Sequence, residues 1–140
     1  MAKCKIIIDT NLWISLLIGK RLLELRSLCN NNSVSIYMCE ELKVEFLRIA
    51  SREKIRKYTT AEHIEKTLEL MNVSCIWSPI TDVAVSSGLR DAKDLYLLAF
   101  TETVKADYLL TGDKDLLVLR THNRTKIMTY KEFETIIATL

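Results

Sequence analysis

The chain has 140 residues, of which 49% are hydrophobic and 27% are charged. This composition is typical of a globular protein, excludes a disordered one, and fits one domain over residues 1–140. A net charge of +2 does not by itself indicate nucleic-acid binding. No apolar stretch approaches the roughly 20 residues of a membrane span, and the start does not resemble a signal peptide, so we expect a cytoplasmic protein without membrane contact.

The early part of the chain alternates between strand and helix patterns. Residues 5–9 are an apolar run with three isoleucines, as expected of a strand buried on both faces. Helical periodicity follows at 12–18, where Asn11 can serve as the cap, and again at 21–29. A second strand is predicted at 34–38.

The middle of the chain continues this alternation. Residues 40–50 and 61–71 have the apolar spacing of amphipathic helices, and 73–77 is predicted to be a short strand. A helix over 91–104 opens with acidic residues, which favour the positive end of a helix.

The end of the chain repeats the pattern once more. A strand at 108–110 is followed by a turn at 111–113 and a short helix that ends at Leu119. A last strand is predicted at 126–128, before a closing helix from about Lys131. Strands alternate with helices, and most of the strands lack the period-two pattern of a half-exposed sheet, which predicts an α/β three-layer sandwich with a central parallel sheet.

The four cysteines and two histidines show no pattern of a metal or nucleophilic site. The cysteines lack paired spacing and neighbouring histidines, and each lies beside apolar residues. Unpaired cysteine is among the residue types most often buried. We therefore expect reduced, structural thiols at Cys4, Cys29, Cys39 and Cys75.

Basic residues gather in two places along the chain. One group is Arg48, Arg52, Lys54, Arg56 and Lys57, and the other is Lys114, Arg120, Arg124 and Lys126. Such groups are usually solvated faces, and they indicate an anionic substrate only where a site is argued independently.

Acidic residues stand where a parallel sheet binds its ligands, beyond the carboxyl ends of the strands. Asp9 ends the first predicted strand, and Asp113 follows the strand at 108–110 after Thr111 and Gly112. Asp94 lies in the first turn of its helix and can reach back toward the same edge. We expect these three carboxylates to converge.

The helix over 40–50 can supply a fourth acid. Leu42, Phe46 and Ile49 define its core-facing stripe, and Glu45 adjoins that stripe. Glu41 lies four residues earlier on nearly the same face, so either glutamate could point inward. Position favours Glu45.

Clustered carboxylates repel one another, and a divalent cation compensates them well. Oxygen ligands without histidine or cysteine favour Mg²⁺ or Mn²⁺. The alternative is that Asp9 caps a helix, Asp94 stabilises a helix terminus, and Asp113 forms a turn. Spacing alone does not choose between the two interpretations.

These residues also carry a family resemblance, in the strings IIIDTNLWIS, EELKVEFLRIA, RDAKDLYLLAF and ADYLLTGDKDLL. In this order they resemble PIN-domain proteins, and among them the toxins of toxin–antitoxin pairs related to the VapC type. The departure is Trp13, at a position that is more often small or aliphatic.

The resemblance implies a metal-dependent endoribonuclease that hydrolyses RNA through a metal-activated water. The implied catalytic and metal-binding residues are Asp9, Glu45, Asp94 and Asp113, with Mg²⁺ or Mn²⁺ as the cofactor. Supporting polar residues are Asn11, Thr111, Asp91 and Asp115, and weaker candidates for substrate phosphates are Arg90, Lys93 and Lys114.

The resemblance also implies partners and leaves alternatives open. Toxins of this kind pair with an antitoxin protein, and many form homodimers. The alternatives are a PIN nuclease that is not a toxin, and a catalytically silent PIN-like binding module. An aspartyl nucleophile at Asp9, as in haloacid-dehalogenase-like folds, is disfavoured because Asn11 stands where a second aspartate is needed.

Overall fold

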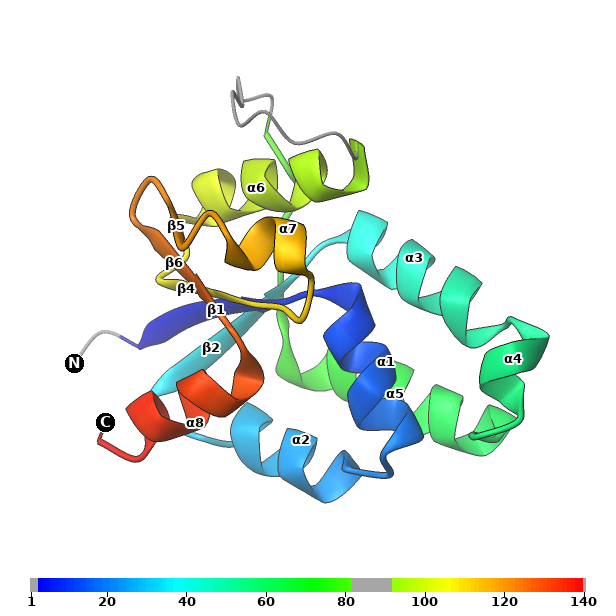
Figure 1. Ribbon diagram of the computed structural model, residues 1–140. Helices are drawn as coiled ribbons and strands as arrows, with labels where there is room; N and C mark the ends of the chain where they lie inside the picture. The colour runs from blue at the N-terminus through cyan, green and yellow to red at the C-terminus, as the bar shows by residue number, and fades with distance from the viewer. Residues whose placement is uncertain (1–2, 82–91, 140) are drawn as a thin grey trace.

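The computed structural model describes residues 3–81 and 92–139, with side chains from residue 94 in the second segment (Figure 1). The described residues contain a six-stranded sheet in the order β3-β2-β1-β4-β6-β5. All neighbouring strands are parallel except the edge pair β5 and β6. The strands are β1 (Cys4–Ile8), β2 (Val34–Met38), β3 (Ile76–Trp77), β4 (Tyr108–Leu110), β5 (Thr121–His122) and β6 (Thr125–Met128).

Helices connect the strands and cover the sheet on both sides. Figure 1 shows α6 along one side of the sheet and α2 and α8 on the other. Ile6, Ile7 and Ile8 of the central strand β1 are fully buried as a result. The helices are α1 (Thr10–Ile18), α2 (Leu22–Cys29), α3 (Glu40–Ala50), α4 (Glu53–Arg56), α5 (Ala61–Ser74), α6 (Ala92–Val104), α7 (Lys114–Leu117) and α8 (Tyr130–Ile137). The predicted α/β three-layer fold is confirmed.

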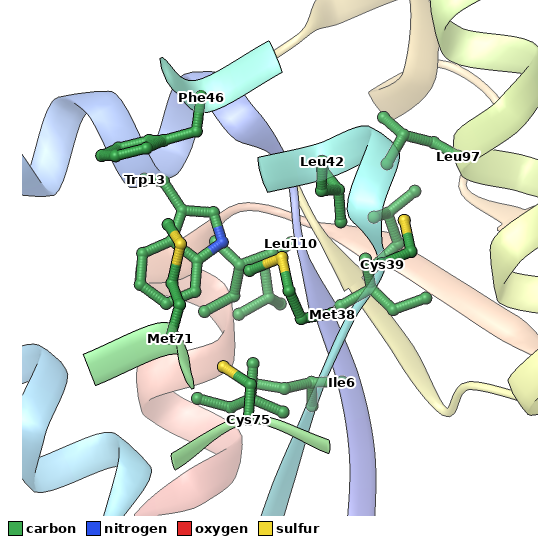
Figure 2. Close-up of a cluster of buried hydrophobic side chains, with 14 of the residues drawn as sticks. Ile6, Trp13, Met38, Cys39, Leu42, Phe46, Met71, Cys75, Leu97 and Leu110 are labelled. Atoms are coloured by element: carbon green, nitrogen blue, oxygen red, sulfur yellow. The ribbon is translucent and has the colours of Figure 1, made fainter. Parts of the chain in front are cut away.

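Large side chains from three helices fill the space beside the sheet. Trp13 of α1 lies close to Phe46 of α3 and Met71 of α5 (Figure 2), and all three are at most 1% exposed. The indole at position 13 therefore fills the core where a smaller residue is more usual. Leu42 and Ile49 are also buried, which confirms the predicted inward stripe of α3.

Several predicted boundaries differ from the structure by two or three residues. Helix α5 continues to Ser74, so the strand predicted at 73–77 is reduced to Ile76–Trp77. The carbonyl of Met71 accepts from the backbone N–H of Cys75 at 3.2 Å and from the indole N–H of Trp77 at 3.1 Å, which ties β3 to the end of α5. Helix α1 begins at Thr10, so Asn11 lies inside its first turn and is not the cap.

The sheet is not purely parallel, because its edge strand β5 runs antiparallel to β6. Strand β5 was not predicted from the sequence. Strands β5 and β6 form an antiparallel hairpin whose turn contains Asn123 at φ 55°. Asparagine tolerates the left-handed conformation better than most residues, so this position was a usable turn signal. The short helix α4 was also not predicted.

All four cysteines are free, as predicted. Burial raises the pKa of Cys4 and Cys29 to about 11, and that of Cys39 and Cys75 to about 12. Thiols with such pKa values are poor nucleophiles at neutral pH, which agrees with a structural role.

None of the helices in the described ranges combines the length and apolar character needed to cross a membrane.

Candidate active site

Asp9 and Asp113 follow β1 and β4, the two neighbouring strands between which the order of strands along the chain reverses. From β1 the chain proceeds to β2 and β3 on one side, and then returns to β4 on the other side of β1. Ile8 and Leu110 are paired at the carboxyl ends of β1 and β4. Open α/β sheets bind ligands in the crevice at this point. Asp9 follows β1 directly, and Asp113 lies three residues beyond β4.

The hydroxyl of Thr111 joins these two segments. Thr111 Oγ1 donates to Asp9 Oδ2 at 2.7 Å and accepts from the backbone N–H of Asp113 at 3.0 Å. Asp9 and Thr111 are each 1% exposed. The predicted supporting role of Thr111 therefore has a geometric basis, since the threonine fixes the orientation of the Asp9 carboxylate.

Asp9 and Asp113 both stand at the N-cap position of a helix, but only one of their side chains makes a capping hydrogen bond. Asp9 occupies the N-cap position of α1, but its side chain makes no capping hydrogen bond. Asp113 does cap α7, because its Oδ1 accepts from the backbone N–H of Asp115 at 2.8 Å. The side chain of Asp9 therefore does not form the helix cap of the alternative interpretation, whereas Asp113, which that interpretation placed in a turn, caps α7.

The helix α3 turns Glu45 inward and Glu41 outward. Glu45 is 6% exposed, and its Oε2 accepts from the phenol of Tyr96 on α6 at 2.7 Å. Burial and this bond to Glu45 raise the pKa of Tyr96, so the phenol stays protonated and remains a donor. Glu41 is exposed. Between the two glutamates, the structure favours Glu45.

An open groove of about 600 Å³ lies beside this pair. It is formed by the outer face of α3 and by Tyr96 of α6, and Figure 1 shows the starts of these two helices on the same side of the molecule. Its lining residues are Glu40, Glu41, Val44, Glu45, Arg48 and Tyr96. The groove gives solvent and ligands a path toward Glu45.

Asp94 lies in the first turn of α6 and is only 2% exposed. Three carboxylates, those of Asp9, Glu45 and Asp94, are therefore buried near the carboxyl edge of the sheet. Burying an ionised carboxylate costs several kcal/mol unless charges or hydrogen bonds compensate it.

The other predicted site residues contribute less or are not described. Asn11, Lys114 and Asp115 are exposed. Arg90 and Asp91 lie outside the described residues, and the side chain of Lys93 is likewise outside them.

The donor set fits a hard divalent cation, because all four acids offer carboxylate oxygens and no histidine or cysteine stands among them. Their spacing is looser than that of a formed metal centre. Within residues 3–81 and 94–139, no three acidic, histidine or cysteine side chains stand close enough to hold one ion.

The sequence profile described as PIN domain matches residues 5–115, which is most of the chain and includes all four acids. The chain belongs to the PIN domain family. The fold of this PIN domain is similar to that in the crystal structure of VapBC2 from Rickettsia felis bound to a DNA fragment from its promoter, with a TM-score of 0.55. The two chains are 12% identical, and the similarity covers 88% of this chain and 96% of the other. No curated protein sequence matches this PIN domain.

Sequence reasoning missed the contact between Tyr96 and Glu45 in this PIN domain. The two residues are 51 positions apart, so no local pattern links them. The only signal was the presence of Tyr96 within the string RDAKDLYLLAF, two residues after Asp94.

Proposed function

We propose that this PIN domain is a divalent-metal-dependent endoribonuclease. The observation that carries the proposal is the burial of Asp9, Glu45 and Asp94 from three separate elements, with Asp113 at the same edge of the sheet. Carboxylate oxygens gathered from separate elements are the donor type that hard divalent cations such as Mg²⁺ prefer. PIN domains are generally nucleases, which agrees with this chemistry.

The residues that would hold the ion are Asp9, Glu45, Asp94 and Asp113. A bound Mg²⁺ or Mn²⁺ would supply a water of lowered pKa and would neutralise charge on the phosphate. No three of these four side chains, all within the described residues, are close enough to hold one ion. Binding would therefore require the carboxylates to move closer together. The exposed ammonium of Lys114 can contact substrate phosphates next to Asp113.

Two hydroxyl groups hold the proposed ligands in place. Thr111 donates to Asp9, and Tyr96 donates to Glu45, both at 2.7 Å. Each bond holds one oxygen of its carboxylate in a defined direction. Hydrogen bonds of this kind orient metal ligands and raise metal affinity.

We further propose that the nuclease is the toxin of a toxin–antitoxin pair and acts on RNA in the cytoplasm. The support is the PIN domain profile together with the similarity in fold to the VapBC2 structure. An antitoxin is then the expected protein partner, and a homodimer the expected assembly. A PIN nuclease without an antitoxin and a silent binding module are the competing functions.

Cleavage of a labelled single-stranded RNA tests the nuclease directly. The wild-type chain should cut it with Mg²⁺ or Mn²⁺ and not with EDTA, and should leave 5′-phosphate ends. Asp9→Asn and Glu45→Gln should lower the rate at least 100-fold. Glu41→Gln is the matched control, because this exposed acid lies on the same helix and groove. Cleavage in EDTA, or an active Asp9→Asn variant, would refute the proposal.

Induced expression in bacteria tests the toxin. Wild-type chain should arrest growth, Asp113→Asn should not, and co-expression of the neighbouring open reading frame should restore growth. If cells tolerate a chain that cleaves RNA in vitro, the toxin assignment fails and the nuclease assignment stands.

A further inference from the structure

A second cavity lies at the amino edge of the sheet, away from the carboxylates. It has a volume of about 780 Å³ and is lined by the starts of β1 and β4, the turn after α6, and the β5–β6 hairpin. Figure 1 shows these segments together on the left of the molecule, while the starts of α1, α3 and α6 lie on the right. At about 3.3 Å per residue, the five residues of β1 separate the two regions by roughly 15 Å.

The lining of this cavity carries a surplus of positive charge. Its basic residues are Lys3, Lys5, Lys105, Arg124 and Lys126, and its one acidic residue is Asp107. The carboxylate of Asp107 is already engaged, because Oδ1 accepts from Arg124 at 2.7 Å and Oδ2 from the backbone N–H of Lys5 at 2.8 Å. Asp107 thus offsets one cation and leaves four, on a chain whose net charge is only +2.

The tertiary structure, and not the sequence spacing, assembles this surface, which we call the amino-edge basic pocket. Lys126 of β6 pairs with Tyr108 of β4, and the hairpin turn brings Arg124 beside Asp107. The group of basic residues seen near the end of the sequence is therefore divided. Arg124 and Lys126 line the amino edge, whereas Lys114 follows Asp113 at the carboxyl edge.

Lys105 contributes its charge from an unfavourable backbone conformation. Its φ is 55°, in the left-handed region that glycine adopts without steric cost. It follows α6 in a C-terminal capping motif in which the N–H of Ala106 donates to Thr101 O at 3.0 Å. Glycine is the usual residue at this position, so the lysine is kept at a small conformational cost.

We propose that the amino-edge basic pocket binds the phosphate backbone of RNA, as a contact region remote from the site of cleavage. This extends the nuclease proposed above and rests on it for the identity of the ligand. Cations on several exposed segments suit a chain of phosphates, which lysine and arginine bind without regard to sequence. The aromatic ring of Tyr108 in the same wall favours nucleic acid over an acidic peptide, because bases stack on aromatic side chains.

The chain offers a matched pair of variants for the test. Lys20 also has a positive φ, 56°, and follows α1 in the same capping motif, with the N–H of Arg21 donating to Leu16 O at 3.0 Å. It does not line the amino-edge basic pocket. Lys105→Gly and Lys20→Gly therefore remove the same charge from the same backbone conformation, and each should leave the chain at least as resistant to urea as the wild type.

Binding is measured by fluorescence anisotropy with a labelled 12-nucleotide oligouridylate in EDTA, between 0.05 and 0.3 M salt. Loss of one phosphate contact should reduce the slope of log K against log salt by about 0.7, which weakens binding about five-fold at 0.1 M. We expect this result for Lys105→Gly and wild-type binding for Lys20→Gly. Equal losses in both variants would indicate a general charge effect and overturn the pocket, as would no loss in either.

Two competitors separate the remaining ligands. If adenosine monophosphate displaces the oligouridylate at micromolar concentration, the pocket is a mononucleotide site and the inference is wrong. If Lys105→Gly weakens binding of polyglutamate but not of oligouridylate, the pocket receives an acidic protein segment and the inference is again wrong. Since binding is measured without metal, a Lys105-dependent complex in a chain that never cleaves RNA would refute the nuclease and leave the pocket standing.

Discussion

Replacing Thr111 with valine tests whether a buried hydroxyl holds the carboxylate of Asp9 in place. Valine has nearly the same shape as threonine, so the 1% exposed position is not emptied. It loses the bond to Asp9 Oδ2 and the bond from the N–H of Asp113. Thr111→Ser is the matched variant, because serine keeps the hydroxyl and loses only a methyl group.

The expected cost follows from these two hydrogen bonds. A bond to a charged group contributes about 1.5–3 kcal/mol and a neutral one about 0.5–1.5 kcal/mol, so Thr111→Val should lower the free energy of unfolding by roughly 2–4 kcal/mol. Thr111→Ser should cost about 1 kcal/mol for one buried methyl group. RNA cleavage should fall with valine and stay near the wild-type rate with serine.

Urea unfolding at pH 7 measures both free energies, and a double-mutant cycle with Asp9→Asn isolates the shared bond. Thr111→Val should lower the free energy of unfolding by less in the Asp9→Asn background, because the bond that it removes there is to a neutral amide and not to a carboxylate. Thr111 does not orient Asp9 if Thr111→Val lowers the free energy of unfolding no more than Thr111→Ser does. The same conclusion follows if the loss caused by Thr111→Val is equal with and without the Asp9 carboxylate.

Three further results are expected. Because the pKa of Tyr96 is raised above its ordinary 10.0 by burial and by its bond to Glu45, the stability it contributes is present below pH 10 and is lost as the pH rises further. The urea midpoint of Tyr96→Phe should therefore decline less between pH 9 and pH 11 than that of the wild type, and equal declines would contradict the assignment. At pH 8, Cys39 and Cys75 should react with a thiol reagent only after unfolding, since a pKa of about 12 in place of 9.0 lowers their thiolate population about 1,000-fold. Fast labelling of the folded chain would show that these thiols are accessible. Finally, Mg²⁺ should raise the melting temperature of the wild type and of Glu41→Gln, and that of Asp9→Asn by less; identical increases in all three would remove Asp9 from the ligands.

The sequence by itself determined the strands that lie at the centre of the sheet and the acids that follow them. The isoleucines of β1 predict a strand covered on both faces, and Asp9 directly after it marks the carboxyl edge. The apolar stripe of α3 places Glu45 next to the core. These predictions succeed because each depends on residues within one helix or strand, where periodicity fixes which side chains share a face.

Local patterns were less reliable at boundaries. The β-branched Val73 suggested a strand, yet it lies in α5 and is 78% exposed, so neither packing nor propensity marked the end of the helix. Strand β6 was predicted, but its hairpin partner β5 was missed, because an edge strand of two residues is too short to show periodicity.

Only the tertiary structure decided how the side chains meet. The bond from Thr111 to Asp9 joins residues 102 positions apart, and that from Tyr96 to Glu45 joins residues 51 positions apart. The amino-edge basic pocket likewise draws its cations from β1, from the turn after α6, and from the β5–β6 hairpin. Such contacts depend on the order of the strands and on how the helices pack across the sheet. Those are set by burial summed over the whole core, which no single segment of the sequence encodes.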